Sequence, residues 1–325
     1  TPLPGAVLTR VASSHIRVGT FQFFAARGDI EGVRILADHA IARHDPAAAE
    51  APNPHRAFLE GVIARQAALV ARWMLIGFIH GVMNTDNTSI SGETIDYGPC
   101  AFMDAYDPAT VFSSIDQMGR YAYGNQPRIM QWNLARLTET VLPLLAEGEE
   151  AALAAGNDVL AGFAPAFEAA YLGGLRAKIG LPGDRAGDAA LAGELLKAMA
   201  ENGADFTLTF RRLCRAAETP EGDAAVRSLF ADPAAYDAWA VNWRARLAEE
   251  GGDLAARAAA MRAVNPAVIP RNHLVEGALE AAMQRDDLGP FNALLESLAR
   301  PYEDQPGADE PPAPAELPYM TFCGT

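Results

Sequence analysis

One stretch of the chain carries the apolar periodicity of a long buried helix. It begins at Asn53-Pro54, a capping residue followed by a proline, which is typical of a first helical turn. Apolar side chains then recur every three or four residues, at Phe58, Leu59, Val62, Ile63, Leu69, Val70, Trp73, Met74 and Phe78. This spacing predicts a helix that continues to Gly81 and leads the chain directly into a polar segment, residues 80–98. His80, at the end of this helix, is expected to be structural and to bond nearby backbone.

Most of the remaining sequence also predicts helices, because alanine is abundant and runs of β-branched residues are scarce. We expect a short pair over 20–26 and 30–41, longer helices over 126–145, 149–178, 188–200 and 205–217, and further helical segments through residue 300. With 325 residues, half of them apolar, the chain can bury a large core in one big domain or two. The predicted fold class is mainly α.

Residues 88–97 predict a small β-hairpin within this helical frame. Two segments rich in β-branched or aromatic residues, 88–91 and 94–97, flank Gly92-Glu93, and a glycine at the first loop position suits a type II′ turn. Such a turn sets Ser91 opposite Thr94 and Ser89 opposite Asp96. Asp86, Asn87 and Asp96 then gather at the open end of the hairpin.

The side chains of Asp86, Asn87 and Asp96 predict a magnesium-nucleotide site. A hard cation such as magnesium prefers oxygen ligands, which an Asn amide and an Asp carboxylate supply together with water and phosphate oxygens. Neither a cysteine nor a histidine is placed to favour zinc here. The alternative interpretation is that Asp86 and Asn87 only cap a turn, as Asp-Asn dipeptides commonly do.

The order of these residues is also that of kinase-like phosphotransferases, in which a catalytic-loop Asn and the Asp of a DFG-type triplet hold magnesium under ATP. Asp96-Tyr97-Gly98 is the candidate triplet. A kinase loop places its catalytic Asp directly after His-Arg or His-Gly, but Val82 occupies that position. The nearest carboxylate is Asp86, so a catalytic base would lie at a different position from that of a kinase. This favours altered chemistry or the absence of catalysis.

Charge and composition argue against several classes of function. The net charge is −15 and no cluster of Lys and Arg appears along the sequence, so nucleic acid and anionic membranes are poor partners. No apolar run is long enough to cross a bilayer. The three cysteines are widely spaced and favour a reducing cytoplasm. Cys214 is expected to be a small buried apolar group, whereas Cys323, near the chain end, is a redox candidate.

Two further features concern the ends of the chain. It begins at Thr1, and neither a phosphate-binding glycine loop nor a strand lysine precedes the candidate site, so we expect half of an ATP site to be missing. Residues 301–325 are expected to form a flexible tail, rich in proline and acidic residues as far as 318 and ending in Phe322-Cys323-Gly324-Thr325.

Specific motifs over almost the whole chain resemble the SelO family of kinase-like protein adenylyltransferases. The matching segments are 10–21, the loop 80–87, Ile95-Asp96-Tyr97-Gly98-Pro99, Gly119-Arg120-Tyr121, Asn125-Gln126-Pro127-Arg128, Trp132-Asn133-Leu134-Ala135-Arg136-Leu137, Asn265-Pro266 and Arg271-Asn272. The resemblance implies transfer of AMP from ATP to Ser, Thr or Tyr hydroxyls of target proteins, with ATP bound in a flipped orientation and pyrophosphate leaving. ATP and hydroxyl-bearing proteins are thus the implied partners.

The resemblance also implies a role for each site residue. Asp86 matches the proton acceptor, Asn87 and Asp96 match the metal ligands for Mg²⁺ (with Mn²⁺ as an alternative), and Arg10 and Arg17, with Asp96, match groups that bind the nucleotide. Residues 1–300 would then form a kinase-like catalytic lobe whose ATP-binding N-terminal lobe lies outside this chain.

Two points qualify this transfer of roles. Some family members form a disulfide between the C-terminal cysteine and the segment after the triplet, but Phe112 stands at the equivalent position, and Cys100 is only nearby. Two alternative functions also stay open, namely kinase-type transfer of the γ-phosphoryl group and an inactive pseudokinase scaffold.

Overall fold

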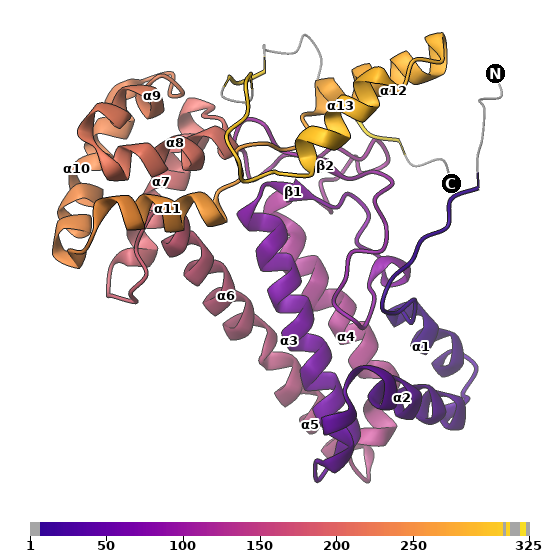
Figure 1. Cartoon of the computed structure of the whole chain (residues 1–325). Coiled ribbons are helices and arrows are strands. Elements are labelled where there is room, and N and C mark those ends of the chain that lie inside the picture. The colour runs from indigo at the N-terminus through magenta and orange to yellow at the C-terminus, as the bar shows by residue number, and fades with distance from the viewer. Residues whose placement is uncertain (1–6, 308–309, 313–318, 323–325) are drawn as a thin grey trace.

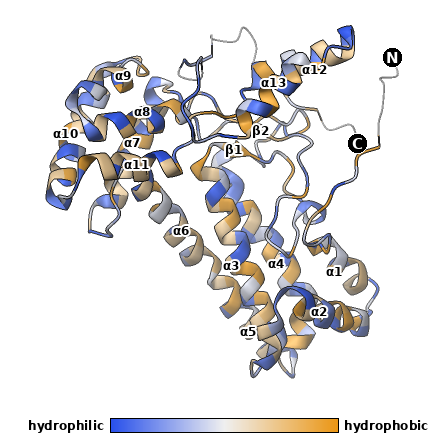
Figure 2. Ribbon diagram, in the orientation of Figure 1, coloured by the Kyte–Doolittle hydropathy of each residue, from blue (hydrophilic) through white to orange (hydrophobic). Residues whose placement is uncertain are grey.

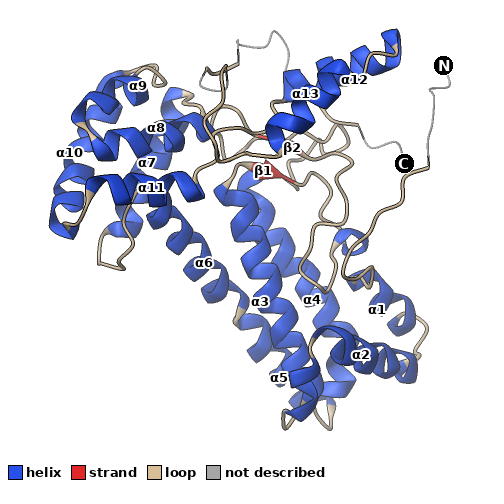
Figure 3. Cartoon of the chain, in the orientation of Figure 1, coloured by secondary structure: helices blue, strands red, loops and turns tan. Residues whose placement is uncertain are grey.

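The computed structural model of the chain describes residues 7–307, 310–312 and 319–322 (Figure 1). Its helices are α1 (Val18–Ala25), α2 (Ile30–His44), α3 (Pro54–Leu75), α4 (Gln126–Leu145), α5 (Glu149–Ala161), α6 (Phe163–Lys178), α7 (Asp188–Asn202), α8 (Phe206–Glu218), α9 (Asp223–Arg227), α10 (Pro233–Glu250), α11 (Leu254–Val264), α12 (Asn272–Arg285) and α13 (Gly289–Leu298). The two strands, β1 (Phe78–Ile79) and β2 (Ala101–Phe102), are short. The predicted mainly helical fold is confirmed (Figure 3).

Helix α3 lies at the centre of one group of helices and packs against both α4 and α6 (Figure 1). The predicted start is confirmed, because the Asn53 side chain accepts a hydrogen bond from the Arg56 N–H at 3.0 Å. The helix ends earlier than predicted, at Leu75. Gly77 follows with φ of 72°, a left-handed conformation that stops the helix and turns Phe78 into a strand.

Hydrophilic and hydrophobic residues are distributed around the helices as expected for amphipathic elements (Figure 2). The predicted helix over 149–178 is two helices, because α5 ends at Ala161 and α6 begins at Phe163 on the other side of Gly162. Within the described part of the chain, no helix is both long and apolar enough to span a membrane.

The strand pairing differs from the predicted hairpin. The two-stranded antiparallel sheet pairs Phe78 with Phe102 and Ile79 with Ala101, so it closes the ends of a long loop, residues 80–100. Inside that loop a single bridge joins Thr88 to Thr94, and the predicted register, with Ser91 opposite Thr94, is wrong.

The register differs because the loop backbone bonds elsewhere. The Ile90 N–H donates to the Ile16 carbonyl, and the Ser89 carbonyl accepts from the buried Gln66 side chain of α3. The segment before α1 and the side of α3 thus replace the strand partner that the sequence pattern suggested.

A second group of helices, α7 to α11, lies to one side of α3, at the left of Figure 1. The stacked rings of Trp239 and Trp243 pack inside it, and each indole N–H donates 2.8 Å to a carbonyl, that of Leu191 and Ile179 respectively. Because Ile179 directly follows α6, the second bond ties the two groups together.

Helix α12 is joined to both groups near the sheet. Arg271, at its start, donates to the carboxylates of Asp104 and Asp205 at 2.6 and 2.7 Å, and Asn272 donates to the Phe102 carbonyl of β2 at 3.0 Å. Arg271 and Asp205 are both buried. Strand β2, which follows the loop 80–100, is therefore linked to the C-terminal helices.

A described part of the C-terminal tail returns to the segment after β2. Thr321 exchanges backbone hydrogen bonds with this segment, accepting from the Ser114 N–H at 2.9 Å and donating to the Phe112 carbonyl at 2.8 Å. Its hydroxyl also donates to the Pro99 carbonyl at 2.7 Å. This short stretch of tail therefore lies against the segment that follows the Asp96-Tyr97-Gly98 triplet.

The Asn53 side chain gives a test of how α3 is anchored. It caps α3 and also donates to the Leu145 carbonyl at the end of α4, at 2.6 Å. We expect Asn53→Ala to lower the free energy of unfolding by about 1 to 3 kcal/mol, since it removes a cap and a second hydrogen bond. Chemical denaturation measures this change.

Two variants serve as controls for that measurement. Asn53→Ser keeps a capping oxygen and should lose less stability than Asn53→Ala. Asn292→Ala, on the exposed surface of α13, should stay within about 0.5 kcal/mol of the parent protein. Equal effects of Asn53→Ala and Asn292→Ala would contradict the anchoring role.

Candidate functional site

The candidate site is built on the loop between β1 and β2. The loop opens at Gly81, whose φ is 82° and whose missing Cβ would lie 2.6 Å from the Pro99 carbonyl oxygen. Only glycine fits this turn without strain. Buried Gln126, the first residue of α4, fixes the same point by accepting from the His80 N–H and donating to the Phe78 carbonyl, at 3.1 and 3.0 Å.

A single 3₁₀ turn, Thr85–Asn87, presents two of the predicted site residues. The Asn84 side chain accepts from the backbone N–H groups of Asp86 and Asn87, each at 3.0 Å. An Asn side chain bonded two and three residues ahead holds the turn closed. The positions of Asp86 and Asn87 therefore depend on Asn84.

Helix α4 supports this turn from beneath through Asn133, whose side chain is fully buried. Its amide donates to the Met83 carbonyl at 2.9 Å and to the Thr88 hydroxyl at 3.0 Å. Thr88 in turn donates to the Asn84 carbonyl at 3.0 Å. One amide group thereby fixes both ends of the segment that carries Asp86 and Asn87.

Asp86 is exposed and rests against the first turn of α1. A Cβ built on Gly19 would overlap the Oδ1 atom of Asp86, so this carboxylate occupies the space where another residue would carry a side chain. Among the described residues its carboxylate oxygens accept no hydrogen bond and form no ion pair. Asp86 is thus positioned by shape and stays available to accept a proton.

Asn87 and Asp96 are placed on the two limbs of the loop. The Asn87 amide donates to the Val82 carbonyl at 3.0 Å, which leaves its Oδ1 uncommitted among the described residues. One carboxylate oxygen of Asp96 accepts from the Gly98 N–H at 3.0 Å. Because the Thr88–Thr94 bridge pairs the limbs in antiparallel fashion, the residues just outside it lie at the same end of the loop.

The donor set of this loop suits a hard cation, since it offers an amide oxygen and a carboxylate oxygen without competing soft ligands. Among the described residues no cluster of three or more His, Cys, Asp or Glu side chains is arranged to hold a metal ion by itself. A cation here would therefore need oxygens from water or from a bound phosphate.

The two predicted arginines lie differently. Arg10 approaches Asp96, with 3.9 Å between its NH2 nitrogen and Oδ1. Arg17 precedes α1, and its backbone forms a bridge with Ser89 of the loop. Its side chain forms no ion pair with any residue that the structure describes. The fold therefore places Arg10 at the Asp96 limb and Arg17 between α1 and the loop.

His80 is structural, as predicted. It is fully buried between the rings of Trp73 and Phe78, and its Nδ1 accepts from the Val82 N–H at 3.3 Å. Burial lowers the pKa of the imidazole to about 4, although the charge of Asp96 opposes this shift. A neutral, enclosed ring of this kind cannot serve as a general base for a substrate in the open loop.

The two described cysteines do not contribute reactive thiolates to the site. Cys214 is buried, as predicted, and its thiol donates to the Phe210 carbonyl. Burial raises the pKa of the Cys100 thiol to about 11, which suppresses the reactive thiolate. Cys323 lies outside the described residues.

Comparisons with known proteins identify this arrangement. The family model described as "Protein adenylyltransferase SelO" matches residues 1–299. The chain belongs to the SelO family. It is therefore an enzyme of the nucleotidyltransferase class, and the resemblance inferred from the motifs is confirmed.

Curated relatives named "Protein nucleotidyltransferase YdiU" agree with this assignment. One from Methylorubrum extorquens is 67% identical over all of this chain and 67% of its own length. Those from Rhodopseudomonas palustris (strain BisB5) and Bradyrhizobium diazoefficiens are 64% and 61% identical over 99% and 100% of this chain. The chain thus spans about two thirds of the length of these SelO-family relatives.

Several supporting residues escaped the sequence analysis. Asn84 could have been found, because an Asn two residues before Asp86 is the usual pattern of an Asx turn. Gly19, Asn133 and Gln126 could not, since their roles depend on which helices pack against the loop. Sequence patterns indicate which residues carry the chemistry but not which residues hold them.

Gly19 tests whether the position of Asp86 matters. In the protein expressed from its complete coding sequence, Gly19→Ala should push the Asp86 carboxylate away from α1 and reduce AMP transfer to protein by about 100-fold, the loss expected if Asp86 is the predicted proton acceptor. The melting temperature should change little because only an exposed side chain has to move. The matched control is Gly193→Ala in α7, where a new Cβ meets no atom within 4 Å. Full activity of Gly19→Ala would contradict this positioning.

His80 gives a test by pH. Because its pKa is lower in the folded chain than its ordinary 6.5, unfolding takes up a proton below that value, and stability is lost as pH falls from 6.5 toward 4. We expect its contribution to reduce the free energy of unfolding by about 2 kcal/mol between pH 7 and pH 5. Denaturant titrations at both pH values measure this.

The same experiment has two controls. His80→Gln should remove that part of the pH dependence, whereas His39→Gln, at an exposed position of α2, should keep it. An NMR titration that finds the His80 ring protonating near its ordinary pKa would show the interpretation to be wrong.

Proposed function

We propose that this enzyme transfers AMP from ATP to Ser, Thr or Tyr hydroxyls of target proteins. The whole-chain match to the SelO family supports the reaction, and the loop that exposes Asp86 beside Asn87 is the structural observation that supports the residue roles. Residues 1–300 are proposed to act as a kinase-like catalytic lobe, with 301–325 as its tail. The unpaired thiols of Cys100 and Cys214 support a cytoplasmic location.

Asp86 is the proposed proton acceptor. Its carboxylate takes the proton of the target hydroxyl while the hydroxyl oxygen forms a bond to the α-phosphorus of ATP. The bond between that phosphorus and the oxygen bridging to the β-phosphate breaks, and its electron pair leaves with pyrophosphate. An exposed carboxylate that accepts no hydrogen bond from a described residue can accept the proton directly.

Asn87 and Asp96 are the proposed metal ligands, through the oxygens that remain uncommitted in the loop. When bound, Mg²⁺ would supply positive charge against the triphosphate. Arg10 is proposed to bind phosphate oxygens, because its guanidinium group already approaches the Asp96 limb, and Asp96 is proposed to contribute to nucleotide binding through the cation. Arg17 is the second proposed nucleotide-binding arginine. Guanidinium forks suit phosphate oxygens, and they orient the nucleotide as well as balancing its charge.

Labelled ATP distinguishes this reaction from the kinase-type alternative. The protein expressed from its complete coding sequence is incubated with target protein and ATP labelled at either the α- or the γ-phosphate. Label from the α-position should enter protein, and label from the γ-position should not. Incorporation from γ-labelled ATP alone would sink the adenylyl-transfer proposal.

A variant of Asp96 separates the enzyme from an inactive scaffold. Asp96→Ala should reduce incorporation of α-label by about 100-fold or more, because it removes a proposed ligand of the cation that would balance charge on the nucleotide. Asp184→Ala, which changes an exposed carboxylate far along the chain in the α6–α7 connection, should be fully active. Unchanged cellular effects of Asp96→Ala would favour the scaffold instead.

A further inference from the structure

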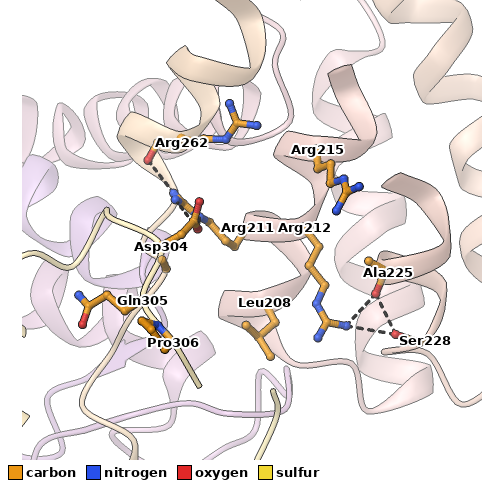
Figure 4. A pocket seen from close by; sticks show the side chains of 11 residues that line it. Leu208, Arg211, Arg212, Arg215, Ala225, Ser228, Arg262, Asp304, Gln305 and Pro306 are labelled. Carbon is orange, nitrogen blue, oxygen red and sulfur yellow. Dashed lines mark hydrogen bonds and ion pairs between the residues drawn. The ribbon is translucent and has the colours of Figure 1, made fainter. Parts of the chain in front are cut away.

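A cavity lies beside the α7 to α11 group of helices, and none of its lining residues belongs to the candidate site on the loop 80–100. It has a volume of about 770 Å³ and opens between α8, α11, α9 with the residue that follows it, and the turn that follows α13 (Figure 4). Its floor includes Leu208, Ala225 and Pro306. The volume falls within the range of small-molecule sites in proteins.

Four arginines line this cavity. Arg211, Arg212 and Arg215 come from α8, and Arg262 comes from α11. The only carboxylate among the described lining residues is that of Asp304. In a chain with a net charge of −15, this is a local reversal of sign. Three of the four lie within five residues of α8, a local basic cluster that the sequence analysis overlooked, and folding adds Arg262 to them.

On one side of the cavity, Arg211 already binds a carboxylate of the chain, that of Asp304. Arg211 donates from Nε and approaches with NH2 the same oxygen of Asp304, at 2.9 and 2.7 Å. Its NH1 donates to the carbonyls of Arg262 and Asn265 at 3.2 and 3.0 Å. Arg211 is thus preorganised by backbone groups, and a carboxylate of the chain occupies its fork.

The other arginines surround the space opposite this side. Arg212 donates to the Ala225 carbonyl and the Ser228 hydroxyl at 2.8 and 3.1 Å. Arg262 pairs with Glu218, outside the lining, at 2.8 Å. Arg215 is exposed and forms no ion pair within 4 Å with a described residue.

One further carboxylate bears on the charge of the cavity. The pKa of Glu221 is lowered mainly by a hydrogen bond to its own backbone, and Arg215 is among the smaller causes. Glu218 and Glu221 therefore offset part of the positive charge of the cavity without lining it.

We infer that this cavity binds a small molecule bearing a phosphate group, with Arg215 among its ligands. A phosphate monoester carries nearly two negative charges and three acceptor oxygens, so one group can accept several guanidinium N–H donors. The Arg211 and Arg262 guanidinium groups already pair with Asp304 and Glu218, whereas Arg215 forms no ion pair with a described residue. The apolar floor leaves room for the remainder of the molecule.

Binding of inorganic pyrophosphate, measured calorimetrically in EDTA, tests this inference. Pyrophosphate should bind the purified chain, and Arg215→Gln should weaken this binding about tenfold, the usual loss for one charge-assisted hydrogen bond. Arg215→Lys, which keeps the charge but not the fork, should have an intermediate effect. Arg215 is exposed, so the melting temperature of each variant should match that of the parent.

Two arginine controls locate the binding. Arg285→Gln, at the exposed end of α12, should leave the affinity unchanged and so exclude a general effect of charge. Arg10→Gln reports on the proposed nucleotide site instead, because Arg10 lies at the Asp96 loop, and it separates binding there from binding in the cavity.

Several results would overturn the inference. These are an absence of binding at millimolar pyrophosphate, equal affinity of the parent and Arg215→Gln, or loss of binding in Arg10→Gln alone. Tighter binding of a glutamate-rich peptide than of pyrophosphate would assign the cavity to an acidic protein segment instead.

Discussion

The hydrogen bonds from buried Asn133 to Met83 and Thr88 are the interaction on which the candidate site depends. They connect the hydrophobic packing of α4 to the polar loop, since an amide enclosed in the core cannot exchange its partners for water. Leaving one buried donor without a partner costs about 1 to 3 kcal/mol, so the loop cannot leave α4 cheaply. The packing of the helical core therefore also holds the turn Thr85–Asn87 in place.

A second constraint acts from the opposite side, where α1 meets the same turn. Gly19 allows the helix to approach so closely that the Asp86 carboxylate fills the missing side-chain volume. The Val18 N–H also donates to the Thr88 carbonyl at 3.0 Å, so α1 and α4 hold the two sides of one short segment. Residues far apart in sequence thus define a loop whose chemical groups are close neighbours.

The sequence predicted the helices well because their signals are local. Asn53-Pro54 and the apolar period of α3 lie within one helix, and the structure confirms its start. The hairpin register failed because a strand pattern does not specify its partner, and here Ile16 and Gln66 took the bonds that Ser91 and its neighbours were expected to make. Asn133 was quoted as part of a motif, but its function depends on the packing of α4 beneath the loop, which no local pattern contains.

Asp86 and Asp96 differ in their contacts, and this difference suits the different roles proposed for them. Asp96 accepts a backbone hydrogen bond and lies near Arg10, interactions that fix its position, as its proposed role of cation ligand requires. Asp86 has no such partners among the described residues, so nothing competes with a hydroxyl proton for its oxygens. The proposed proton acceptor benefits from this freedom, whereas a proposed metal ligand benefits from being fixed. The same short loop therefore supplies both kinds of carboxylate by bonding one and leaving the other to be positioned by shape alone.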